Sequence, residues 1–472
     1  MRLFRLGALS AAVLGLTLLV RSDDEPARPA GVLQEFELPR LSLSAFGYEQ
    51  AELDAAVPRG LIALDRPGFG SGLVALRGNR FIGITDRGPN TDHFSVDASC
   101  TPLPGVNGKT FPLPQFTPAL VFFEGIAGTL RLSSVVNLVD PSGARVTGLT
   151  NEAGDETPFD SRCRNTPLPY NPSGMDVEDL ALLPSGKFLG VEENKPSIFI
   201  GDLTTGVVER RYTPAGSTLP GAGYGVSDRL PAILRHRRIN GGFEAVTVSP
   251  DGKVAYTATQ NPLGAATGGS PYRNSRVLRI LRLDVSNPYD LQVTGQFILL
   301  MSDRAEYPAT IGQRHLKLSA MGWVAPDILL LLERSDEPAR GGVRLILVDL
   351  QGATNVHGWP VADTLTPENV ATDLTALGIT PASTDVVFQE LETDEARIFS
   401  TYKLEGMAIR NRTDLAIIND NDFGILAPDS PTRLWVLRLA TRLRWATSAG
   451  PCATNLPADS PSETAPTRVS RC

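Results

Sequence analysis

A short unit of two strands with acidic ends recurs along the chain, and it constrains the fold more than any other feature. The clearest copy covers residues 177–194. Two apolar stretches flank Pro184-Ser185-Gly186-Lys187, which is typical of a β-hairpin turn. The start of one hairpin strand lies beside the end of the next, so we expect Glu178, Glu192 and Glu193 to gather at one end.

Four further copies of this hairpin cover residues 71–88, 243–260, 318–335 and 404–421. A second pair of strands follows most of the hairpins, and together they would make a four-stranded antiparallel sheet. Such sheets arranged radially form a β-propeller. We therefore predict an all-β fold, a β-propeller with four-stranded antiparallel blades. The hairpins should form the inner strands of successive blades, with no two hairpins in one continuous sheet.

The number of blades is less constrained than the type of fold. The repeats account for five blades, and a sixth could come from the N-terminal segment or from an insertion. We favour six blades and leave five and seven open. A pair of β-sandwiches is the second architecture, but it would not explain why the same unit recurs.

The N-terminus has the composition of a secretory signal peptide over residues 1–22. Arg2 and Arg5 precede an apolar stretch at residues 8–20 that is short for a membrane span. An uncleaved N-terminal anchor is the alternative. The other expected parts are a disordered spacer at 23–35, the propeller domain at 36–445 with a loop insertion at 91–163, and a Cys-bearing tail at 446–472.

The four cysteines fit an oxidising compartment and show no metal-binding or redox spacing. Cys100 and Cys163 both lie in the insertion, whereas Cys452 and Cys472 both lie in the tail. We expect these two local pairs to be bonded, although other connectivities stay open. A secreted or periplasmic location follows from the cysteines and the signal peptide together.

The formal net charge of -8 argues against non-specific nucleic-acid binding and is compatible with cation binding. No other stretch is long and apolar enough to span a bilayer, and we expect a monomer. Neither a nucleophile elbow nor a nucleotide-binding fingerprint is present. Because the chain has only four histidines, carboxylates are the most plausible catalytic groups.

Four stretches carry a resemblance to a known family. They are Ile84-Thr85-Asp86-Arg87-Gly88-Pro89-Asn90, Val177-Glu178-Asp179-Leu180-Ala181, Gly241-Gly242-Phe243-Glu244-Ala245-Val246 and Lys403-Leu404-Glu405-Gly406-Met407-Ala408-Ile409. Over roughly residues 61–439, the chain resembles the phytase-like family described as having esterase-like activity, a secreted bacterial β-propeller group. The resemblance implies a hydrolase whose acidic residues lie in a repeated domain. The calcium-dependent propeller phytases are a more distant analogy.

A propeller places the first strand of each blade around a central channel, and alternate residues of a strand share a face. We therefore expect a ring of carboxylates at one channel mouth, with basic residues between them. The expected catalytic residues are Glu178, Glu244 and Glu405. The expected metal ligands are Asp86, Glu193 and Asp420. The expected substrate-binding residues are Arg87, Lys317, Arg334 and Lys403. Further expected members of the ring are Asp176, Glu192, Glu333, Asn419 and Asp422.

Carboxylate oxygens suit Ca²⁺ or Mg²⁺, and a metal flanked by Lys and Arg suits a phosphate ester. The leading hypothesis is a secreted metal-dependent hydrolase of phosphoric esters that acts on a small molecule. The alternative is a non-catalytic propeller that binds a ligand or partner protein through the same mouth. A third is a propeller that processes a sugar or lactone with the cation alone. For each single residue, an ion pair that merely closes the channel explains the pattern equally well.

The cysteine assignment predicts a Cys452–Cys472 disulfide in the mature protein. Peptide mapping under non-reducing conditions should recover the two cysteines in one linked fragment. Recovery of both as free thiols would contradict the pairing and weaken the assignment to an oxidising compartment.

Overall fold

The computed structural model describes residues 31–60, 63–264, 272–307, 311–336, 341–391, 393–394, 397–399, 401–425 and 427–443, without the side chains of 106–107. The expected signal peptide at 1–22 and the tail at 446–472, with Cys452 and Cys472, lie outside these ranges. The spacer expected at 23–35 lies outside them only up to residue 30. Residues 31–35 belong to a strand, because this segment finds a pairing partner near the other end of the chain.

The described residues form mainly antiparallel sheets with few helices. The first sheet contains β2 (Gly72–Ala75), β3 (Arg80–Ile84), β6 (Ala119–Ile126), β7 (Thr129–Asn137), β1 (Gly31–Glu37), β24 (Arg433–Arg438), β23 (Asp414–Asn419) and β22 (Leu404–Ile409), in that spatial order. The second contains β9 (Val177–Leu182), β10 (Lys187–Glu192), β11 (Ser197–Asp202), β12 (Val208–Pro214) and β13 (Gly225–Leu230), which is parallel to β12.

Two more sheets have four strands each, in sequence order. They are β14 (Phe243–Val248), β15 (Val254–Thr259), β16 (Val277–Asp284) and β17 (Gln292–Leu300), and then β18 (Leu316–Ala325), β19 (Ile328–Ser335), β20 (Gly342–Asp349) and β21 (Ser383–Leu391). The helices are α1 (Gln50–Ala56) and the 3₁₀ turns η1 (Leu43–Phe46), η2 (Val57–Arg59), η3 (Ala232–His236), η4 (Pro288–Asp290), η5 (Arg304–Glu306), η6 (Gln313–His315), η7 (Pro360–Asp363) and η8 (Asp422–Gly424).

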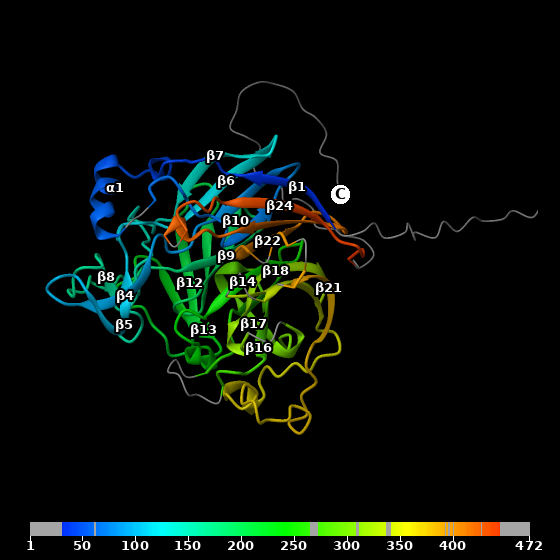
Figure 1. The fold of residues 1–472 in the computed structure, drawn as a ribbon. Helices are drawn as coiled ribbons and strands as arrows, with labels where there is room; N and C mark the ends of the chain where they lie inside the picture. Colours follow the sequence, from blue (N-terminus) through cyan, green and yellow to red (C-terminus); the bar gives the residue numbers. More distant parts are fainter. Residues whose placement is uncertain are drawn as a thin grey trace, which may run out of the picture.

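The first strands of the hairpins lie side by side around one axis. β2 contacts β9, β9 contacts β14, β14 contacts β18, β18 contacts β22, and β22 contacts β2. Figure 1 labels β9, β14, β18 and β22 near the middle of the molecule and β7 and β21 toward its edge. This closed cycle, with each sheet extending outward, is the arrangement of a β-propeller. The cycle contains five first strands, and the described residues hold no sixth sheet of this kind. The preference for six blades is therefore not supported.

The N-terminal strand closes the ring. β1 pairs antiparallel with β24, from Gly31 opposite Arg438 to Glu37 opposite Arg433, and so adds a fourth strand to β22–β23–β24. Glu37 also pairs with Thr129 of β7, which joins two four-stranded units into one eight-stranded sheet. The expectation that no two hairpins share a sheet was wrong for 71–88 and 404–421, because β1 bonds to strands on both of its sides.

The expectation of one loop insertion over 91–163 was wrong, because β6 and β7 lie inside this range and complete the first four-stranded unit. The parts on either side of them form a small sheet of their own outside the ring, and we keep the name insertion for these parts. Its strands are β4 (Thr91–Val96), β5 (Pro102–Thr110) and β8 (Pro158–Phe159). The expected Cys100–Cys163 disulfide is confirmed. No helix in the described ranges has both the length and the apolar character needed to cross a bilayer.

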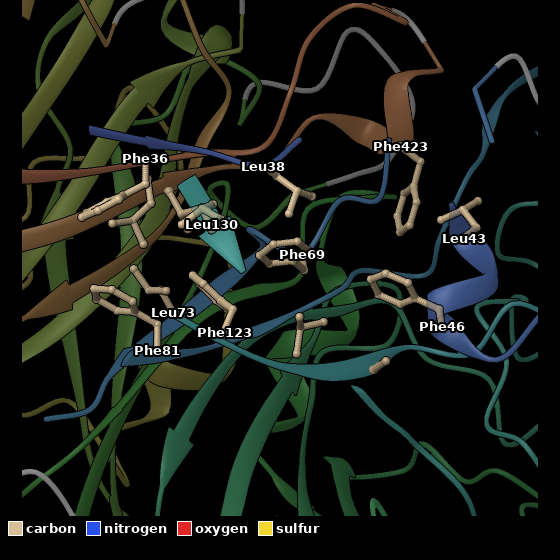
Figure 2. Close-up of a cluster of buried hydrophobic side chains, with 14 of the residues drawn as sticks. Phe36, Leu38, Leu43, Phe46, Phe69, Leu73, Phe81, Phe123, Leu130 and Phe423 are labelled. Atoms are coloured by element: carbon tan, nitrogen blue, oxygen red, sulfur yellow. The ribbon is translucent and has the colours of Figure 1, made fainter. Parts of the chain in front are cut away.

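Apolar side chains fill the space between neighbouring four-stranded units, including the two units that share the first sheet. Figure 2 shows one such cluster, in which Phe36 of β1 and Leu130 of β7 lie near Phe81 and Phe123. The Phe81 and Phe123 rings stack with centroids 5.6 Å apart. Because sheets pack on both faces, β9 is buried along its whole length. This packing holds the first strands in place at the axis.

Replacement of Phe36 by alanine should destabilise the protein, because Phe36 is 3% exposed and fastens the closing strand β1 to the core. We expect a loss of about 3–5 kcal/mol in the free energy of unfolding, measured by urea denaturation. The matched control is Leu33→Ala on the same strand, where the side chain is 46% exposed and the cost should be below about 0.5 kcal/mol. Equal losses for the two variants would show that β1 does not fasten the ring.

Candidate functional site

The three expected catalytic glutamates occupy equivalent β-bulges. The pairing register of each hairpin skips one residue at the entry of its first strand, and that residue is Glu178, Glu244 or Glu405. Ser319 has the same place on β18. A bulge leaves one residue unpaired and re-aims its side chain. The recurring sequence unit therefore marks a recurring backbone irregularity at the channel end of four hairpins, whereas β2 and β3 pair without such a skip.

The structure brings these glutamates together with other carboxylates at one mouth of the channel. Glu178, Glu244 and Glu405 are all buried. Burial raises the pKa of Glu178 well above its ordinary value, and nearby negative charges raise it further. Those charges are the carboxylates of Asp176, Glu193, Glu244 and Glu405.

The expected metal ligands fall into two separate groups of carboxylates. Asp86 and Asp420 lie with Asp422, and we call these three residues the Asp420 group. Glu193 lies with Asp176 and Glu178, and we call these three the Asp176 group. In each group, one oxygen from every residue lies within 4.8 Å of the others. The predicted set of Asp86, Glu193 and Asp420 thus does not form a single site.

The Asp420 group already contains a cation. The Lys403 ammonium lies 2.8 Å from Asp420 Oδ2 and 2.8 Å from Asp422 Oδ1, and 3.2 Å from Glu405 Oε1. Burial lowers the pKa of Lys403, but these carboxylates outweigh burial and raise it well above its ordinary value. Lys403 is therefore charged and offsets the repulsion between its neighbours.

The Asp176 group is less completely neutralised. Arg87 Nε lies 3.0 Å from Asp176 Oδ2. Glu193 is 3% exposed, and its Oε1 has no hydrogen-bond partner within the described part of the chain. Burial and then the Asp176 charge raise the pKa of Glu193 to about 7, against the opposing effect of Lys317. Three buried carboxylates with an unpartnered oxygen fit a hard divalent cation such as Ca²⁺ or Mg²⁺.

The expected substrate-binding cations lie at the same mouth, each beside a carboxylate. Arg334 Nη2 donates to Glu405 Oε1 at 2.5 Å. Lys317 stands opposite Arg334 in the β18–β19 register, and its charge lowers the pKa of Glu193. Glu244 accepts a 2.8 Å hydrogen bond from the Gln260 side chain, and its other oxygen, Oε1, has no partner among the described residues.

Two residues expected in the ring point elsewhere. Glu192 lies 2.9 Å from the buried Arg211 guanidinium. Glu333 accepts from the Tyr307 hydroxyl at 2.7 Å, and its neighbour Arg334 reaches the ring instead. Successive side chains of a strand point to opposite faces, so two adjacent residues cannot both line the channel.

Sequence reasoning missed several contacts of the mouth because they come from loops without the repeat signal. The missed residues are Glu152, Asp155, Glu156, Lys195, Arg237, Asn240 and Gln260. Gln260 alone had a usable signal, since it follows the second strand of its hairpin just as Glu193 does.

The raised pKa of Glu193 predicts that the metal-free protein loses stability as the pH rises from about 4.5 to about 7. The folded protein holds this proton more tightly than the unfolded chain, so the contribution is complete below the unfolded pKa and lost through the folded pKa. The shift corresponds to roughly 3 kcal/mol. Urea unfolding in EDTA at several pH values should show a smaller loss for Glu193→Gln than for wild type.

Glu124→Gln is the control for this measurement, because Glu124 lies on β6, the third strand of its unit, away from the channel. It should keep the wild-type pH dependence. If Glu193→Gln also kept it, Glu193 would not titrate in this range.

Solved structures that match the chain share little sequence with it. The PQQ-bound aldose sugar dehydrogenase from Streptomyces coelicolor is 11% identical, with a TM-score of 0.33, over 88% of this chain and 99% of that chain. A luciferin-regenerating enzyme is 8% identical, with a TM-score of 0.33, over 79% and 92%. A putative glycoside hydrolase from Parabacteroides distasonis is 11% identical, with a TM-score of 0.36, over 80% and 88%. Scores this low support no argument about this chain.

Comparison of the sequence with protein families is more specific than comparison with solved structures. No curated protein matches the chain. A family model described as "Phytase-like: Esterase-like activity of phytase" matches residues 67–423, which include every first strand and both carboxylate groups. The chain is therefore a member of the phytase-like family with esterase-like activity.

Proposed function

We propose that this protein is a metal-dependent hydrolase of phosphoric esters, phytase-like in its chemistry, with its site at the acidic mouth of a five-bladed propeller. Family membership supports a hydrolase. One observation supports a bound metal ion: Glu193, in the Asp176 group, has a buried carboxylate oxygen without a hydrogen-bond partner. A buried carboxylate oxygen without a donor is costly unless a cation or a proton compensates it.

The Asp176 group is the better of the two candidates for the ion. In the Asp420 group, the Lys403 ammonium already contacts Asp420 and Asp422. The ligands would be Asp176, Glu178 and Glu193, and Ca²⁺ or Mg²⁺ would fit their hard oxygens. A bound ion of this kind polarises a phosphoryl oxygen and lowers the pKa of a coordinated water.

The protein's own residues would supply the remaining functions. Arg87, Lys317 and Arg334 carry the positive charge that would hold phosphate oxygens, and the Arg guanidinium suits two of them at once. Glu244 would accept the proton of the attacking water through its unpartnered Oε1. Burial, followed by the nearby Glu193 charge, raises the pKa of Glu244 well above its ordinary value, which strengthens it as a base. As the water oxygen bonds to phosphorus, the ester P–O bond would break, and the ester oxygen would leave as the alcohol with the proton that Glu244 had accepted.

Glu405 would position Arg334 and Lys403 rather than touch the substrate. Its Oε1 lies 2.5 Å from Arg334 Nη2 and 3.2 Å from Lys403 Nζ. This role differs from the catalytic role expected from the repeat, because the Glu405 carboxylate contacts these two basic residues.

The alternative is a non-catalytic propeller that binds a ligand or partner protein at the same mouth. It is favoured by the ion pairs Arg334–Glu405 and Lys403–Asp420, which close part of the channel without any ion. A secreted or periplasmic monomer remains our proposal for the mature protein, supported by the Cys100–Cys163 disulfide.

The proposal predicts that Ca²⁺ or Mg²⁺ raises the melting temperature, because a metal at ~100 times its Kd adds about 2.7 kcal/mol to the stability. Glu193→Gln should remove this shift, whereas Asp422→Asn, an equal loss of charge in the Asp420 group, should keep it. Glu244→Gln should keep the shift and lower hydrolysis by roughly 10²-fold or more. Thermal melts and assays on phosphomonoesters and phosphodiesters, with and without EDTA, measure these effects.

Two outcomes would overturn the proposal. If neither metal shifts the melting temperature of wild type, the carboxylates are structural. If the shift is present but no phosphoric ester is hydrolysed, the mouth is a binding site and the alternative holds.

A further inference from the structure

A short acidic segment of the insertion lies on three basic residues at the channel mouth. We call this segment, residues 152–156, the strap. Each of its three carboxylates contacts one of these residues, and Glu156 also lies 4.0 Å from Lys109 Nζ. The pairs are Glu152 with Lys195, Asp155 with Arg237, and Glu156 with Arg87 at 2.7 Å.

The three cations belong to the candidate site. Arg87 Nε lies 3.0 Å from Asp176 Oδ2, so the same guanidinium contacts both the strap and the Asp176 group. Lys195 and Arg237 both lie beside Asn194. Lys195 is the next residue in the chain, and Arg237 donates a hydrogen bond to the Asn194 carbonyl. Asn194 in turn follows Glu193 of the Asp176 group. The strap therefore covers the edge of the proposed metal site.

The strap is held mainly by charge. No residue from 152 to 157 is buried, and a Cβ added at its tip, Gly154, would meet only open space. The segments on either side are anchored differently: the buried Asn151 amide donates to backbone carbonyls, and the Thr157 carbonyl accepts from the Lys109 amide at 2.9 Å. The Arg87 and Arg237 pairs are largely buried, so salt screens them little, and a competing anion is what would displace the strap from them.

The cations beneath the strap are shielded from water. The Arg87 side chain is 3% exposed and the Lys195 side chain is 8% exposed. Buried charges of this kind need an anionic partner, whether from the strap or from a ligand. Their strap partners are at most about 14 Å apart along an extended chain, a span that one ligand with several anionic groups can match.

We propose that Arg87, Lys195 and Arg237 form a binding site for a ligand with two or more anionic groups, such as a multiply phosphorylated ester, and that the strap occupies this site until the ligand displaces it. This inference deepens the proposed function, because the site adjoins the Asp176 group. Lys195 and Arg237 are thereby assigned to substrate binding, and Glu152, Asp155 and Glu156 compete with the substrate.

Calorimetric titration with inorganic tripolyphosphate in EDTA tests the site without metal or hydrolysis. The double variant Asp155→Asn/Glu156→Gln removes two competing charges and should bind about tenfold more tightly than wild type. Arg237→Gln should bind about tenfold more weakly. The control is Asp160→Asn, in the same insertion but paired with Arg164 at 3.5 Å, which should bind as wild type does. Equal affinities for all four proteins would overturn the inference.

Hydrogen exchange on wild type tests displacement directly and needs no variant to fold. Amides of residues 152–156 should exchange several times faster with tripolyphosphate bound than without it, because the strap has left its cations. Unchanged or slower exchange upon binding would overturn displacement. These results are independent of the metal-dependent melting shift, so this inference and the proposed function can fail separately.

Discussion

The repulsion among buried carboxylates at the axis is the constraint on which the site depends. Five first strands meet there, and three of them place a glutamate at the bulge by which they enter the ring. Such a gathering is unfavourable unless positive charge offsets it. Lys403 does so for the Asp420 group, and Arg334 does so for Glu405. The Asp176 group has only part of this compensation, so a bound cation there would offset the remaining negative charge.

The same crowding explains how the strands approach each other. A Cβ added at Gly72 of β2 would lie 2.8 Å from the Asp179 Cα atom of β9, so these two strands tolerate no side chain between them. Asp179 also accepts a 2.9 Å hydrogen bond from the Val246 amide of β14, which links neighbouring sheets close to the axis. Closure by β1 then fixes the ring as a whole. The positions of the glutamates are thus set by contacts between blades as much as within them.

Loops outside the repeated hairpins lie around the acidic mouth and limit access to it. The insertion is tied by Cys100–Cys163 and brings Glu156 to Arg87, which also contacts Asp176. A segment far outside the repeated hairpins therefore shares a cation with the site that the repeats build. The Arg87 guanidinium thus links Glu156, which lies over the mouth, to Asp176, which lies beneath it.

The sequence alone determined the all-β class, the five hairpins and the gathering of Glu178, Glu244 and Glu405, because each of these follows from a local, repeated pattern. It also indicated the Cys100–Cys163 pair, whose members share one insertion. Only the tertiary structure decided the rest. Ring closure by β1 and the cycle of five first strands depend on pairing between distant segments. The separation of Asp86 and Asp420 from Glu193, and the turning of Glu192 toward Arg211, depend on bulges and strand faces that residue types do not encode. The strap on Lys195 and Arg237 joins loops with no repeat at all, so only packing in space brings their charges together.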